Sequence, residues 1–343
     1  MRRALLVLAA AVAAHAAAGC KSTERETAEA RYEQAEEWFM MSKYAEAKGL
    51  YKQALDLTQG EYPEAALGLA NTYRELCRLE SMRFVDGEEK NGIDVQRVQS
   101  YYTEAERFFR WALEKKPGYR DAYYGLGLLY FETAVSKTIA VAICRSDAER
   151  LDHHWRKLEA ARDRFEKAYE LDIAPKSGAP QEYLAQIYNL LGIEVARRND
   201  LNGATECFEK SYASADLYIT WVRYQMRPRM DPKLFDFFEK RIRDFEALKS
   251  DLDMSLATLH GRLAGLNVRG GDAEGAILSC QKSRVCCARY LAWLQKQPAP
   301  AAEPTYKETR AKKVNEVKAA VEKILTDLGR PPAPEPPAPT AKP

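Results

Sequence analysis

Histidine and carboxylate pairs are the residues of this chain whose types could support metal or acid–base chemistry. His153 and His154 are adjacent. Adjacent residues of a helix point about 100° apart, so the two rings are poorly placed to bind one metal ion. Glu36 and Glu37 lie in a charged stretch that is typical of a solvated helix face. The sequence therefore predicts no catalytic residues, no metal site and no cofactor, and an enzyme is kept only as a third hypothesis.

Cys20 is the cysteine whose position indicates a covalent modification. Arg2 and Arg3 precede the apolar run 4–14, which is too short to cross a bilayer as a mature helix and is typical of an export signal. The run leads into Ala17–Cys20 (AAGC). These four residues resemble a bacterial lipobox, although the lipobox usually has Leu at the first position.

The lipobox resemblance implies a lipoprotein that is cleaved before the cysteine and acylated on its thiol. Residues 1–19 would be the signal peptide and 20–27 a tether to the membrane. Each buried CH₂ of an acyl chain contributes about 0.8 kcal/mol, so two or three chains anchor the protein firmly. Lys21 follows the cysteine, which by resemblance to enterobacterial sorting implies an outer-membrane lipoprotein facing the periplasm. The alternative is an ordinary signal peptide, cut after Ala16 or Ala18, that releases a soluble periplasmic protein.

The other six cysteines show no C-x-x-C pair and no zinc-binding spacing; they are Cys77, Cys144, Cys207, Cys280, Cys286 and Cys287. Export makes disulfides chemically possible. The sequence favours free buried thiols and leaves a bridge among Cys280, Cys286 and Cys287 as the alternative.

Composition limits the classes of function. Of the 343 residues, 46% are hydrophobic and 30% charged, the balance of a globular chain. The net charge is only +2 and the two signs are interleaved, so the sequence predicts no nucleic-acid partner.

A two-helix motif recurs along the chain. Its clearest copy is Tyr123-Leu126-Gly127-Tyr130 followed by Ala161-Phe165-Ala168. Small residues let two helices approach closely, and the aromatic residues fill the space beside them. Each hairpin cannot bury its apolar face alone, so the copies are expected to stack.

Five ordered copies over about residues 28–285 resemble the tetratricopeptide repeat (TPR) family. The resemblance implies an all-α fold, an α-solenoid of stacked antiparallel helical hairpins over 28–297. The second and third copies each carry an insertion of about 22 residues. This length is close to three extra helical turns in each of the two helices of the hairpin. These two hairpins are therefore expected to be elongated, with a loop in place of the extra turns as the alternative.

The C-terminal third departs from the repeat pattern. Residues 218–253 are interpreted as a degenerate repeat between the fourth and fifth copies, with Asp231 as the N-cap of a new helix. Residues 298–304 form a Pro-rich linker, 305–329 an amphipathic helix, and 330–343 a Pro-rich disordered tail. The helix is expected to dock on the chain's own solenoid, although pairing with a second copy or another protein stays open.

The TPR resemblance also implies where partners bind. In related repeats the first helix of each hairpin lines the concave face, so this groove would be lined by Tyr32, Glu36, Phe39, Asn71, Arg74, Tyr124, Leu128, Phe131, Asn189, Ile193 and Arg197. Aromatic, Arg and Asn side chains suit an extended or helical peptide. The alternative is that the aromatic residues pack against a neighbouring hairpin.

The sequence as a whole indicates a lipid-anchored TPR scaffold that binds protein partners at a bacterial envelope membrane, for outer-membrane assembly, pilus biogenesis or secretion-type complexes. The alternative is a substrate-binding or accessory subunit of an envelope transporter. An open groove would favour the scaffold, and a closed apolar cavity the accessory subunit.

Lipidation makes the first testable prediction. The substitution Cys20→Ala removes the only thiol at the signal boundary, so the protein should move from the membrane to the soluble periplasmic fraction. Fractionation together with labelled palmitate measures this. A variant that stays on the membrane, with a wild-type chain that takes up no label, would rule out the lipoprotein.

Overall fold

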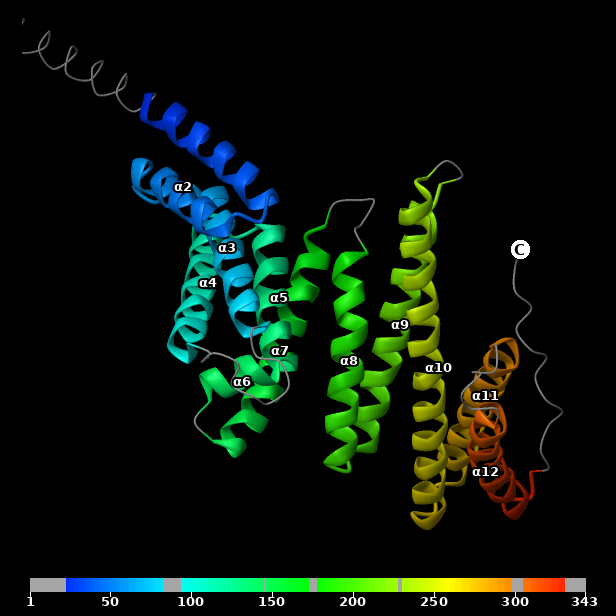
Figure 1. Ribbon diagram of the computed structural model, residues 1–343. Coiled ribbons are helices and arrows are strands. Elements are labelled where there is room, and N and C mark those ends of the chain that lie inside the picture. Colours follow the sequence, from blue (N-terminus) through cyan, green and yellow to red (C-terminus); the bar gives the residue numbers. More distant parts are fainter. Residues whose placement is uncertain are drawn as a thin grey trace, which may run out of the picture. The chain divides into compact units, whose positions relative to one another are not determined.

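The computed structural model describes residues 23–82, 94–144, 146–172, 178–227, 230–297 and 305–330, and the regular structure in these ranges is entirely helical. The chain divides into two compact units, residues 1–175 and 176–343, called unit 1 and unit 2 below (Figure 1). The predicted signal peptide, Cys20, the linker 298–304 and the tail from residue 331 lie outside the described residues.

Unit 1 is a stack of helical hairpins. Its helices are 23–40, α2 (Tyr44–Leu57), α3 (Pro63–Met82), α4 (Val95–Lys115), α5 (Arg120–Val135), α6 (Lys137–Ile143) and α7 (Asp147–Glu170). The first helix begins at residue 23, inside the predicted tether, because 23–27 continue its helical pattern. Among α2 to α7, the most extensive contacts join α3 to α4 and α5 to α7. The prediction of an all-α solenoid of antiparallel hairpins is confirmed.

Glycines of the first helices lie directly against aromatic rings of the second helices. A Cβ atom on Gly68 would overlap the ring of Tyr51, and one on Gly125 would overlap Phe109. A Cβ on Gly127 would lie 3.2 Å from the ring of Phe165. These contacts are the close helix approach that the repeat motif predicts.

The two elongated hairpins differ in how they use their extra residues. In the second copy, α3 and α4 are both long, with 20 and 21 residues, as expected. Residues 83–93, which connect them, lie outside the described residues. In the third copy α7 is long, with 24 residues, and it is capped by Ser146, whose Oγ accepts from Glu149 N–H.

The first helix of the third copy is not one long helix, and the expectation for it is wrong. Ser136 has extended dihedral angles and its Oγ accepts a hydrogen bond from Ile139 N–H at 3.3 Å. This N-cap starts a new helix, α6, bent by 92° from α5. Ile139 and Ala142 then bury their side chains, and α6 packs mainly on α4 and α5.

Unit 2 contains α8 (Ala179–Arg197), α9 (Leu201–Gln225), α10 (Pro232–Arg269), α11 (Ala273–Lys296) and α12 (Tyr306–Asp327). Asp231 caps α10 as predicted, because its carboxylate accepts from Lys233 N–H at 2.8 Å. However, 218–253 is not a separate repeat. The stretch 233–260 contains no Gly or Pro that would end a helix, so α10 runs for 38 residues into the first helix of the fifth copy.

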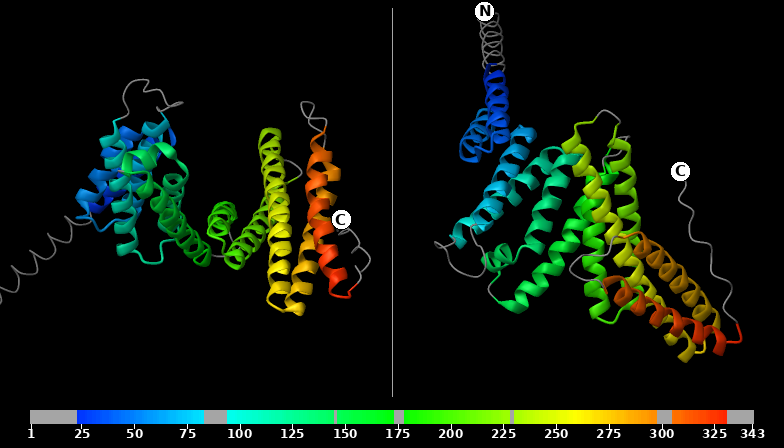
Figure 2. Two further views of the ribbon diagram at one scale, coloured as in Figure 1. Left: turned by 90° about the horizontal axis from the view of Figure 1, so that it is seen from below. Right: turned by 45° about the vertical axis from the view of Figure 1, so that its right-hand side comes forward.

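Helix α12 packs on α11 and α10, in agreement with the expected self-docking (Figure 2). Val314 and Val321 are completely buried, and Leu325 is nearly so. Val321 and Leu325 form a cluster with Ala264 and Cys280. The apolar stripe that would be unstable on a lone helix is thereby covered.

The six cysteines outside the signal segment, all of them among the described residues, are not joined in disulfides. Five are buried and Cys207 is half-buried. The proposed bridge among Cys280, Cys286 and Cys287 is therefore wrong for this structure, because each of these thiols packs as a small apolar side chain.

The contact between Gly127 and Phe165 makes a prediction about stability. Gly127→Leu would force a side chain into the ring of Phe165, and overpacking of this kind costs about 1–3 kcal/mol. The melting temperature should fall. The matched control is Gly49→Leu in α2, where a Cβ would meet nothing within 4 Å; it should leave the melting temperature unchanged or raise it, because Leu favours a helix over Gly by about 1 kcal/mol. Equal melting curves for the two variants would contradict the packing.

Candidate functional site

The predicted groove residues on helix 23–40 make contacts within unit 1. The Tyr32 ring lies 5.9 Å from Tyr51 and 5.4 Å from Tyr62, measured between ring centroids. Glu36 accepts a hydrogen bond of 2.5 Å from the Tyr51 hydroxyl. Phe39 meets Tyr44 edge to face, with centroids 5.3 Å apart. All three side chains are half-buried, so each joins neighbouring helices and keeps part of its surface exposed.

The predicted residues on α3 and α5 are also partly used inside unit 1. Arg74 forms ion pairs with Glu75 (2.6 Å) and with Glu132 of α5 (3.7 Å). Burial raises the pKa of Glu132, although Arg74 opposes the shift. The remaining groove residues of these helices are Asn71 and Tyr124, which are half-buried, and Leu128 and Phe131, which are buried.

The three predicted residues on α8 belong to unit 2. Asn189 is half-buried, Ile193 is 37% exposed and Arg197 is ion-paired with Glu194. The predicted groove residues thus lie in two separate units, eight in the first and three in the second. Their joint action as one groove stays a prediction.

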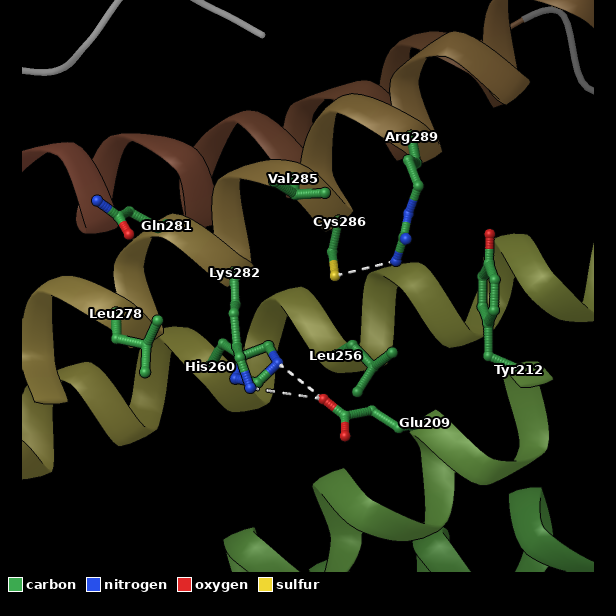
Figure 3. A pocket seen from close by; sticks show the side chains of 10 residues that line it. All are labelled: Glu209, Tyr212, Leu256, His260, Leu278, Gln281, Lys282, Val285, Cys286 and Arg289. Atoms are coloured by element: carbon green, nitrogen blue, oxygen red, sulfur yellow. Dashed lines mark hydrogen bonds and ion pairs between the residues drawn. The ribbon is translucent and has the colours of Figure 1, made fainter. Parts of the chain in front are cut away.

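A pocket of unit 2 lies on other residues. It has a volume of about 400 Å³, is open to solvent, and is lined by side chains of α9, α10 and α11 (Figure 3). The lining residues are Glu209, Tyr212, Leu256, His260, Leu278, Gln281, Lys282, Val285, Cys286 and Arg289. Helix α10 packs against both α9 and α11, so Leu256 and His260 lie between two helical walls.

His260 is the most unusual polar side chain of the pocket. Only 4% of the residue is exposed. Its Nε2 lies 3.9 Å from Glu209 Oε1, which is too far for a hydrogen bond. Burial, helped by the nearby Lys282 ammonium, lowers the pKa of His260 to about 4. The imidazole is therefore neutral at pH 7 and has an unused capacity for hydrogen bonding.

Arg289, which lines the pocket, is paired with Asp253, which does not. Arg289 Nε donates to Asp253 Oδ1 at 2.8 Å, and its guanidinium lies 4.7 Å from the centroid of the Tyr212 ring. Burial raises the pKa of Asp253 to about 6, against the opposing effect of Arg289. Burial also raises the pKa of Cys286 to about 12, so this thiol stays protonated and is a poor nucleophile.

Sequence reasoning missed the pocket because it treated the second helices only as packing elements. Leu278 and Val285 are seven residues apart, on the same face of α11, and are 55% and 44% exposed. The buried Ala276 and Cys280 define the core face of this helix. The signal available in the sequence was therefore a second pair of apolar residues with helical spacing, which lies beside the buried face of α11.

The described residues contain no group of three or more His, Cys, Asp or Glu side chains placed to hold a metal ion. Across the same ranges, no single helix is both long and apolar enough to span a membrane, and α5 with α6 meets the length and composition criteria only as a bent pair.

No protein-family model matches the sequence, and no curated protein matches it significantly. Among solved structures, the chain is similar to TTC0263, a thermophilic TPR protein of Thermus thermophilus. That match has 13% identity and a TM-score of 0.35, and it covers 84% of this chain and 99% of that one. Yeast Tom70 matches with 14% identity and a TM-score of 0.20, over 88% of this chain and 70% of its own. At TM-scores this low, the fold assignment rests on the helix packing described above.

The buried imidazole predicts a pH dependence of stability. The unfolded chain binds a proton at His260 with the ordinary pKa of 6.5, whereas the folded pocket resists protonation until about pH 4. The contribution of His260 to stability is therefore complete above pH 6.5 and decreases as the pH falls towards 4, by about 3 kcal/mol at most.

His260→Leu should flatten the plot of unfolding free energy against pH in this window. Denaturant titrations between pH 7 and 4 measure the difference between variant and wild type. Asp253 titrates in the same window with the opposite sign, but it is present in both proteins and largely cancels. Parallel curves would show that the imidazole is freely protonated in the folded protein.

Proposed function

We propose that this protein is a lipid-anchored helical-repeat scaffold that binds segments of partner proteins at a bacterial envelope membrane. The observation that carries the proposal is the open pocket of unit 2, where the apolar side chains of Leu278 and Val285 are exposed beside polar groups. Partners of this kind would belong to outer-membrane assembly, pilus or secretion-type complexes.

The form of the pocket supports a protein segment as the ligand. Its two walls are the helices α9 and α11, and its floor is α10. A trough between helices fits an amphipathic helix or an extended peptide that inserts apolar anchors. Full burial of one Leu or Val side chain contributes about 1.5–3 kcal/mol, so a few anchors give a useful affinity.

The membrane tether is supported by the AAGC sequence that ends at Cys20. An acylated N-terminus would confine the binding surfaces to the membrane, which raises their effective concentration for partners in the same membrane. The choice of the outer membrane rests on Lys21 alone.

The transporter-accessory alternative has less support. It predicts an enclosed apolar cavity that surrounds a small molecule. The 400 Å³ pocket opens to solvent and places charged residues such as Glu209 and Lys282 on its walls, which favours a polymer that enters from one side.

The test of this proposal is peptide binding by the purified chain. Peptides of twelve residues are selected from a random displayed library, and their affinities are measured by fluorescence anisotropy. Replacing both Leu278 and Val285 by Asp should weaken the selected peptides at least tenfold, because the apolar anchors lose their contacts.

The matched control is Leu217→Asp. Leu217 is 49% exposed on α9 and does not line the pocket, so its replacement should leave the affinities unchanged. If the library yields no binding peptide for the wild-type chain, the scaffold proposal fails. If the control weakens binding as much as the double variant, the pocket does not carry the function.

A further inference from the structure

The pocket of unit 2 contains a polar group that its own surroundings leave without a hydrogen bond. Within the described part of the chain, the charged group paired with the His260 ring is Glu209, at 3.9 Å. The ring nitrogens are not among the fully buried polar atoms that lack a partner, so they reach the open pocket, where a ligand group can bond to them. A hydrogen bond made there contributes about 0.5–1.5 kcal/mol, so the imidazole is a point of specificity.

We propose that the pocket accepts an aromatic side chain of the partner that carries a neutral hydrogen-bond donor, Tyr or Trp, and that its O–H or N–H bonds to His260. This inference rests on the proposed function, since it names the anchor that a protein partner inserts. A phenol hydroxyl can donate to one ring nitrogen or accept from the other, and an indole N–H can donate.

The charged groups beside His260 are already paired with each other. Glu209 Oε1 lies 3.9 Å from the imidazole Nε2 and 3.8 Å from Lys282 Nζ, and Figure 3 shows these three side chains converging at one side of the pocket. The Glu209–Lys282 pair has no net charge to complement an inserted carboxylate or ammonium, so a neutral donor suits this side of the pocket.

The size and the walls of the pocket fit an aromatic body. A volume of about 400 Å³ is near the lower end of the range for ligand pockets, about 300–1,000 Å³. Leu256, Leu278 and Val285 supply apolar contacts, and Tyr212 with Arg289 supplies a ring and a guanidinium beside them. Aromatic side chains bury about 150–250 Å² each and often use their polar edge when buried.

The size of the expected discrimination follows from the hydrogen bond. A site built to bond a ligand hydroxyl rejects the analogue that lacks it, because the buried partner in the site is left unpaired. One such bond corresponds to a loss of up to about tenfold in affinity when Tyr is replaced by Phe.

The experiment selects peptides from the same random library with the full chain, and then compares this chain with its His260→Leu variant. For each selected peptide, Tyr or Trp is replaced by Phe, and both versions are titrated against both proteins. Wild type should select Tyr or Trp at one fixed position and lose up to about tenfold on replacement by Phe. His260→Leu should bind both versions equally or prefer Phe. Circular dichroism of the variant checks that it remains folded.

A second variant keeps the test decisive if His260→Leu unfolds. Leu278→Asp changes an exposed residue at the pocket mouth and should abolish binding of the Tyr peptide while the fold remains. Selected peptides that bind as well with Phe as with Tyr would overturn the inference but leave the scaffold proposal standing. Peptides that bind Leu278→Asp as tightly as the wild type would overturn the inference and also remove the support that the pocket gives to the scaffold proposal. The absence of any selected peptide would overturn both.

Discussion

The close approach of small residues to aromatic rings is the constraint on which the hairpin packing depends. Gly68 and Gly125 lie so near Tyr51 and Phe109 that no side chain fits between them. Unit 2 repeats the arrangement with Gly192 against Phe208. In an interior packed this densely, a small change in the volume of one side chain displaces its neighbours. Each contact therefore fixes the separation of two helices, and with it the positions of the residues on their other faces.

Polar interactions also hold together the helices of the elongated hairpins of unit 1. Tyr130 of α5 donates to Glu106 of α4 at 2.7 Å. Lys157 of α7 lies over the Tyr130 ring, with its Nζ 4.3 Å from the centroid, and Nζ is also hydrogen-bonded to Tyr102. Burial lowers the pKa of Lys157, although Glu106 opposes this. A buried network in which only some groups are hydrogen-bonded costs free energy. These groups therefore favour one register of α4, α5 and α7.

The unit 2 pocket is a consequence of helix length. The 38 residues of α10 pack against α9, α11 and α12 at different points along one helix. Val314 and Val321 of α12 cover one side of the α10–α11 pair, whereas Leu278 and Val285 remain exposed where α9 and α11 border the pocket. Packing thus covers some apolar side chains of this region and leaves those of the pocket available to a partner.

The sequence by itself determined the repeats, the packing residues of the repeat motif and the start of α10. Gly127 and Phe165 belong to a repeat motif whose residue types and spacing are recognisable, and the cap Asp231 acts through hydrogen bonds to neighbouring backbone groups. Three features depended on packing. Ser136 is a short polar residue inside an otherwise helical pattern, and only the burial of α6 decides that it starts a new helix. The continuity of α10 depends on neighbours along its whole length. The pocket joins Glu209, His260 and Lys282 from three helices, and a linear pattern contains no information about side chains that meet only when hairpins stack.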